Sequence, residues 1–420
     1  MTISILNLPK LLFTTFWILG LSCFALDAIQ AQDMVPERNP THDDQDSILN
    51  MDATYNRPFM TKKGSAVAIG GYLEANAIHT IEEGLTEGLM FQARRMSIFM
   101  SSSIGKRLSF LTELEIEDGG KTIGIEFASM DVALHPLFNL RGGIIMNPIG
   151  AFNENHDGPK WEFVERPDMA VQMLPTTWSN AGFGIFGKIH HQQWILGYEA
   201  YLTNGFDGSI IDNEMHKTYL PATKANGDRF EESFGDRPLT TAKIAVKNRR
   251  WGEVGVSYMG GQFNRTMEDG LQIASDHLRL HTFAIDITTK IPVLRTEVTG
   301  EAARIYVDVP ASYTQQYGNQ QQGFFIDVVQ PIIQKPMFGW DNARINLSGR
   351  LDYVDWNVGT FRETGTAIGD HQWAVTPSIS FRPSGQTVFR FNYRYQWTTD
   401  ILNNPAELSA SWLFGFSTYF

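Results

Sequence analysis

Cysteine is almost absent from this sequence. The chain has 420 residues and one cysteine, Cys23. A small exported domain held together by disulfides would need several cysteine pairs, so the sequence excludes that class of protein. Stability must then come from a large folded structure or from a surrounding membrane.

Charge is also sparse, and acidic residues are in excess. Charged residues make up 19% of the chain, and the formal net charge is -12. An acidic chain without a basic stripe is a poor match for a nucleic-acid binder, so we expect no nucleic-acid partner. The sequence contains no HExxH or GxSxG motif, and we therefore expect no enzyme, no cofactor and no metal.

Long hydrophobic runs are missing after the first 30 or so residues, where nothing approaches the ~18 apolar residues of a spanning helix. The exception is "LLFTTFWILGLSCFAL", which follows Lys10 and precedes small residues. This pattern predicts a signal peptide over residues 1–31, with cleavage after Ala31 or Ala25. An uncleaved anchor and a lipoprotein lipidated at Cys23 remain as alternatives. Residues 32–65 are polar, and we expect an exposed periplasmic leader there.

Short alternating segments fill the chain from residue 66 to residue 420. In "QTVFRFNYRYQW" the aromatic residues occupy every second position, with Arg390 and Arg394 between them. The closing "SWLFGFSTYF" alternates in the same way. Period-two alternation indicates strands that lie between two different environments. About 16 such segments predict an all-β protein, a transmembrane antiparallel up-and-down β-barrel that is wide enough for a water-filled channel. The predicted strands begin near residues 66, 89, 105, 123, 138, 180, 192, 238, 250, 277, 290, 322, 342, 370, 386 and 407.

The links between these segments alternate between long and short. The predicted long loops are 81–88, 148–179, 205–237, 261–276, 309–321, 355–369 and 400–406. All of them follow odd-numbered strands, so they would lie at one end of the barrel. Long outer loops and short periplasmic turns are typical of bacterial outer-membrane barrels. We therefore expect the bacterial outer membrane as location, with its lipid and the barrel assembly machinery as partners. The terminal Phe420 resembles the residue by which that machinery recognises its substrates.

Three stretches resemble a known family. They are "ARRMSIFMSSSIGKRLSFLTELEIED", "FNLRGGIIMNPIGAFNE" and "ERPDMAVQMLPTTWSNAGFGIFGKI", between about residues 94 and 188. They resemble porins O and P, the phosphate-selective porin family. The resemblance implies a homotrimer and an anion path made of an arginine ladder and a lysine cluster. No matching lysine cluster can be placed in this acidic chain.

Two features select the candidate site residues: loop length, and strand parity, meaning which alternate positions of a strand face the lumen. Parity predicts these pore-lining side chains: Arg107, Glu113, Glu115, Arg344, Arg350, Arg390 and Arg394. Loop 148–179 is the predicted constriction, with these candidates: Glu154, His156, Asp157, Lys160, Glu165, Arg166 and Asp168. An outward surface loop, and solvated charges without a role, remain the alternatives.

Together these features predict an outer-membrane porin for the passive diffusion of small hydrophilic solutes or ions. One alternative is a phosphate- or anion-selective porin. Another is a structural or adhesive outer-membrane barrel.

Overall fold

The computed structural model describes residues 48–58, 67–310, 318–361 and 364–420. The predicted signal peptide and most of the predicted leader lie outside these ranges. Within them, no helix has both the length and the hydropathy that a membrane crossing requires.

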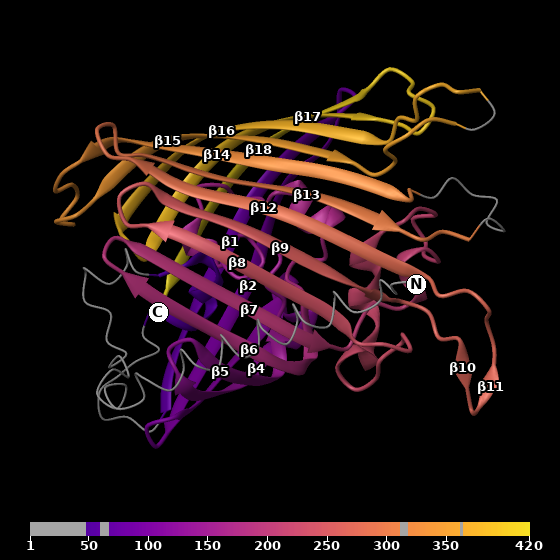
Figure 1. Ribbon diagram of the computed structural model, residues 1–420. Coiled ribbons are helices and arrows are strands. Elements are labelled where there is room, and N and C mark those ends of the chain that lie inside the picture. Colours follow the sequence, from indigo (N-terminus) through magenta and orange to yellow (C-terminus); the bar gives the residue numbers. More distant parts are fainter. Residues whose placement is uncertain (1–47, 59–66, 311–317, 362–363) are drawn as a thin grey trace, which may run out of the picture. The chain divides into compact units, whose positions relative to one another are not determined.

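Sixteen strands form one closed antiparallel barrel, as the sequence predicts (Figure 1). They are β1 (Val67–Glu82), β2 (Leu85–Ile104), β3 (Leu108–Glu117), β4 (Thr122–His135), β5 (Phe138–Met146), β6 (Ser179–His191), β7 (Trp194–Thr203), β8 (Leu239–Asn248), β9 (Gly252–Gln262), β12 (Arg279–Ile291), β13 (Thr296–Val307), β14 (Gln320–Gln334), β15 (Arg344–Asp355), β16 (His371–Ser384), β17 (Thr387–Thr399) and β18 (Glu407–Tyr419). Each strand pairs with the next, and β1 pairs with β18 from Tyr72 opposite Tyr419 to Glu82 opposite Ser409.

The described residues before β1 and between the strands form only short elements. A small hairpin, β10 (Met267–Glu268) and β11 (Leu271–Gln272), lies in the link between β9 and β12. The helical turns are η3 (Asn50–Asp52), η4 (Thr54–Asn56), η5 (Asp118–Gly120), η6 (Gly158–Lys160), η7 (Met169–Met173), η8 (Gly208–Ile210), η9 (Leu220–Ala225) and η10 (Gly227–Phe230). The strands therefore carry the architecture.

Strand β17 shows why alternation specifies the barrel. Phe389 and Phe391 are exposed on the outer face, whereas Arg390 between them is buried inside. On the neighbouring strand β18, Trp412 is 47% exposed and its ring stacks on Phe391 with centroids 5.4 Å apart. Aromatic side chains on adjacent strands thus cover the outside, and charged side chains point into the lumen.

The first predicted long loop, 81–88, is wrong. β1 continues to Glu82 and β2 begins at Leu85, so only Glu83 and Gly84 form the turn. Both residues have positive φ angles, 48° and 83°. Such a pair gives the tight two-residue hairpin whose twist matches that of the flanking strands. The strands therefore extend through the stretch that was predicted to be a loop.

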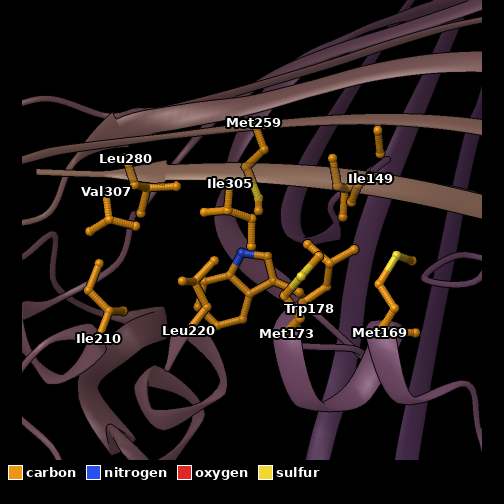
Figure 2. Close-up of a cluster of buried hydrophobic side chains, with 14 of the residues drawn as sticks. Ile149, Met169, Met173, Trp178, Ile210, Leu220, Met259, Leu280, Ile305 and Val307 are labelled. Atoms are coloured by element: carbon orange, nitrogen blue, oxygen red, sulfur yellow. The ribbon is translucent and has the colours of Figure 1, made fainter. Parts of the chain in front are cut away.

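The loop between β5 and β6, residues 147–178 and hereafter the inner loop, folds into the barrel. Its Trp178, Met169 and Met173 are fully buried in an apolar cluster with Met259 of β9 and Ile305 of β13 (Figure 2). The loop between β7 and β8, residues 204–238, joins the same cluster. It contributes Phe206, Ile210, Ile211 and Leu220. Trp178 stacks on Phe206 with ring centroids 4.9 Å apart.

Residues 48–58, hereafter the N-proximal segment, also lie within the barrel. Leu49 and Met51 are 0% and 2% exposed and pack against Ile195 and Ala245 of the inner wall. The expectation of an exposed leader is wrong for this segment. The physical reason is that its apolar residues Leu49 and Met51 pack on the inner wall, while its polar residues Asn50, Thr54 and Arg57 find hydrogen-bond partners inside the barrel.

Candidate functional site in the barrel lumen

The inner loop is attached to the wall by ion pairs with the arginines of the last strands. Glu162 accepts from Arg382 at 2.5 Å, and Asp168 accepts from Arg394 at 2.5 Å. All four side chains are nearly buried. Buried pairs of this kind fix geometry strongly, since removing one partner leaves an uncompensated charge.

A glycine lets the loop approach the opposite wall. The main-chain N–H groups of Ala151 and Phe152 both donate to Glu301 Oε2, at 2.9 and 3.0 Å. Gly150 has φ of 64°, and a Cβ at this position would lie 1.8 Å from Glu301 Oε1. Only glycine combines this backbone conformation with so close a contact.

The predicted basic residues on the last strands face the lumen, but carboxylates neutralise them. Arg350 makes two hydrogen bonds to Asp327, at 2.6 and 2.7 Å, and donates to the Glu165 carbonyl at 2.8 Å. Arg390 pairs with Glu74 of β1. The Arg344 side chain is 29% exposed and lies 3.9 Å from a carboxylate of Glu297.

The predicted acidic residues are paired in the same way. Glu113 of β3 accepts from Arg57 of the N-proximal segment at 2.6 Å, and Glu115 pairs with Arg95 of β2. Arg107 does not lie on the third strand, and that prediction is wrong. It occupies the turn between β2 and β3 and is exposed, because β3 begins only at Leu108.

The first half of the inner loop places three predicted residues beside Arg57. His156 has Nδ1 2.7 Å from the Asn153 carbonyl, so this nitrogen carries the proton. Burial lowers the pKa of His156 below its usual value. Burial alone would raise the pKa of Asp157, but the Arg57 guanidinium outweighs it and holds that pKa well below the usual range. Lys160 lies 3.3 Å from Asp157, and Glu154 is buried with its carbonyl accepting from Thr54.

A small cavity separates the middle of the inner loop from the wall. Its volume is about 10 Å³, room for about one water molecule. Arg166, Arg350 and Glu74 are among its lining residues. The Nη2 atom of Arg166 is buried and has no hydrogen-bond partner among the described residues. The buried Nε of Arg390 on β17 likewise has no hydrogen-bond partner among these residues.

Another buried cation comes from the loop between β7 and β8. Lys224 donates to the Thr176 carbonyl at 3.3 Å. Burial lowers the pKa of Lys224 to about 8, Arg166 and Arg229 act in the same direction, and Glu126 and Glu115 oppose them. The charge of Lys224 therefore changes just above neutral pH.

Three side chains could in principle hold a metal ion. Glu113, Glu126 and His156 each offer one ligand atom, and these atoms lie within 4.8 Å of one another. However, Arg57 Nη1 lies 2.6 Å from Glu113 and Arg57 Nη2 lies 3.4 Å from His156 Nε2. A guanidinium already supplies the positive charge that these donors attract.

Sequence reasoning missed a second buried ion cluster. Arg141 of β5 contacts Asp131 at 2.8 Å and Glu199 at 3.3 Å, and its guanidinium lies 3.5 Å from the Tyr55 ring centroid. It also missed Glu74 on β1 and Arg95 on β2. The inward parity of β1, β2 and β5 would have selected these residues.

Comparisons with known proteins support the fold. No protein-family model matches the sequence. An uncharacterized protein of Aquifex aeolicus (strain VF5) is 34% identical over 230 residues, which are 52% of this chain and 49% of that protein. This chain thus spans about half the length of the curated relative it matches.

Two solved structures share the architecture at low sequence identity. The anion-selective porin from Comamonas acidovorans has a TM-score of 0.51 and 9% identity, over 84% of this chain and 99% of that chain. The outer membrane channel DcaP of Acinetobacter baumannii has a TM-score of 0.51 and 12% identity, over 86% and 99%. At these identities the likeness is one of fold, and this chain has the barrel fold of these two channels.

Proposed function

We propose that this protein is a porin of the bacterial outer membrane, through which small hydrophilic solutes or ions diffuse passively. One observation carries the proposal: a closed barrel of 16 strands holds an inward-folded loop whose carboxylates pair with wall arginines. A loop held in this way narrows the lumen and sets charges along it, which is how pores select solutes.

The outer face of the barrel supports a location in lipid. Phe283, Ile285 and Val256 are 51%, 53% and 58% exposed on adjacent strands. Apolar side chains this exposed over several strands are costly in water and favourable in a bilayer. Membrane lipid is the partner that this face fits. Insertion by the barrel assembly machinery remains a prediction from the sequence.

The charges of the lumen favour a weakly selective pore. Arginines and carboxylates lie in local pairs such as Arg350 with Asp327 and Arg390 with Glu74. Paired charges cancel at distances greater than their separation, so neither cations nor anions gain a strong advantage. The proposed cargo is therefore broad, comprising small hydrophilic solutes or ions of either sign.

The anion-selective alternative rests on different residues. Arg166 has a buried nitrogen without a hydrogen-bond partner among the described residues, and Lys224 is a buried cation of the neighbouring loop. The sequence also resembles the phosphate-selective porins O and P. That alternative predicts that phosphate blocks chloride current. The same resemblance favours a homotrimer, which chemical cross-linking in detergent would detect. The absence of enzymatic activity stays a prediction.

Conductance tests the proposal. Purified protein in a planar bilayer should give discrete current steps, and reversal potentials in a salt gradient should report its ion preference. Phe414→Leu is a suitable control, because it keeps an apolar side chain on the outer face and should leave the steps unchanged. Folded protein that inserts but never conducts would favour a structural or adhesive barrel instead.

A further inference from the structure

Arg57 of the N-proximal segment lies in a site built from two carboxylates. Its Nε donates to Asp157 Oδ2 at 3.0 Å and its Nη2 to Asp157 Oδ1 at 2.5 Å. Its Nη1 donates to Glu113 Oε2 at 2.6 Å. The fork of Asp157 therefore matches the fork of the guanidinium, and Glu113 holds the third nitrogen.

Two aromatic rings complete this site. The Arg57 guanidinium carbon lies 4.0 Å from the Phe99 ring centroid and 5.4 Å from that of Phe127. Both rings are fully buried, and Arg57 itself is 4% exposed. The Tyr419 hydroxyl donates to Asp157 at 2.7 Å and fixes that carboxylate. Aromatic faces together with a bidentate carboxylate recognise a planar, delocalised cation better than a compact ammonium.

The N-proximal segment belongs to no strand of the barrel, and many of its contacts involve side chains. Asp52 pairs with Lys188 of β6 at 2.7 Å, and the Asn50 N–H donates to Glu253 of β9 at 3.0 Å. A segment held by such contacts resembles a bound peptide more than a structural strand, and it occupies space inside the lumen.

We propose that Asp157, Glu113, Phe99 and Phe127 form a guanidinium-binding site of the lumen, which Arg57 fills from within the chain. The N-proximal segment then acts as an internal plug, and solutes bearing a guanidinium group compete with it. This inference rests on the proposed function only where it says that displacing the plug changes transport. Binding of a guanidinium group at the site does not depend on that function.

Chemical rescue tests the site in the full chain. Arg57→Ala removes the guanidinium and its linker. Adding n-propylguanidinium should raise the melting temperature of this variant in detergent, whereas n-propylammonium should not. The matched control is Arg94→Ala, an exposed arginine on the same barrel, which should show no rescue. Equal effects of the two probes, or no effect of either on a folded variant, would overturn the proposal.

A second measurement uses the wild-type chain and does not depend on the folding of a variant. Hydrogen–deuterium exchange labels amides that leave protected positions, and mass spectrometry locates the label. The amides of residues 48–58 should be protected, and n-propylguanidinium should speed their labelling severalfold while n-propylammonium leaves it slow. Labelling of this segment that ignores both probes would refute competition at this site.

Bilayer recordings separate this inference from the proposed function. n-Propylguanidinium should increase the conductance of wild-type channels if it displaces the plug. Selective rescue and labelling in a protein that never conducts would support the binding site and refute the porin proposal. Conductance without rescue or labelling would support the porin proposal and refute the binding site.

Discussion

Arg390 on β17 and Glu74 on β1 form an ion pair across β18, the strand that closes the barrel. Arg390 lies opposite Gly415 of β18, and Glu74 lies opposite Ser417, two residues further along the same strand. The pair therefore spans the closing strand on its lumen face. The two side chains are 1% and 6% exposed, so the contact is shielded from solvent.

Breaking this pair should destabilise the barrel. Glu74→Gln leaves the Arg390 charge buried without its partner, and such losses cost about 3–5 kcal/mol. Urea unfolding in micelles would measure the change. The exposed pair Arg94–Asp118 provides the control, because Asp118→Asn should cost no more than about 1 kcal/mol. Equal losses at the two sites would show that burial of the Arg390 pair has no energetic consequence.

Neutralising lumen charge should move ion selectivity in a predictable direction. Arg390→Gln combined with Arg394→Gln exposes their carboxylate partners, so permeability should shift toward cations. Glu113→Gln combined with Glu115→Gln should shift it toward anions. Reversal potentials would report both shifts. They should shrink in high salt, because the Debye length falls from about 10 Å at 0.1 M to about 3 Å at 1 M. If neither double variant changes the potential, these side chains do not line the conducting path.

Lys224 should make selectivity depend on pH. Its pKa is lowered to about 8, so raising the pH through this value removes a positive charge from the lumen and permeability should shift toward cations. Between pH 8 and its ordinary pKa of about 10.4 the unfolded chain binds the extra proton, so this group makes stability rise with pH there. Reversal potentials at about pH 7 and about pH 9 test the first effect. Lys224→Met should abolish it, whereas Lys335→Met in an exposed turn should not.

Charge on the outer face should impair insertion. Phe414 is 49% exposed on β18, on the face that we assign to lipid. Phe414→Arg should cost about 2–4 kcal/mol if the site lies near the bilayer midplane. The heat-dependent gel shift of folded barrels would measure the inserted fraction, with Phe414→Leu as the apolar control. Normal yields of the arginine variant would contradict a lipid-facing position.

The apolar cluster should hold the inner loop in place. Trp178→Ala removes the ring that stacks on Phe206, and such core truncations cost about 3–5 kcal/mol. The loosened loop should then become sensitive to trypsin after Lys160, which precedes Trp161. Limited proteolysis would reveal the cut. Trp340→Ala, at a position that is 46% exposed, should leave the loop resistant.

The strands could be predicted because alternation is a local property. In β17 every second residue from Phe389 is aromatic, and this pattern distinguishes the two faces of the strand whatever its neighbours are. The turn at Glu83 and Gly84 left only a weak local signal: glycine suits the second turn position, but Glu83 is not one of the residues that two-residue hairpins favour at the first. The hairpin was predicted as a long loop because β1 and β2 are longer than the usual strand and extend into residues 81–88 from both sides.

Much of the lumen could not be predicted, because its contacts join distant parts of the chain. Glu74 and Arg390 are 316 residues apart in sequence, and Arg57 and Asp157 are 100 apart. Strand parity predicts that Arg390 points inward, but it does not identify Glu74 as the carboxylate that pairs with it. The arginines therefore looked like a free basic wall, whereas the structure shows a neutralised one.

The apolar cluster inside the barrel also changes what assembly requires. On β12 and β13, Leu280 and Ile305 are fully buried inside, while Phe283 and Tyr306 are 51% and 38% exposed outside. This part of the wall carries apolar side chains on both faces, so a preference for lipid does not by itself determine which face points outward. Without the inner loop, an apolar strip on the lumen face would be exposed to water and to other unassembled chains. We therefore expect the inner loop to cover this apolar strip during assembly and to reduce aggregation of the newly formed barrel.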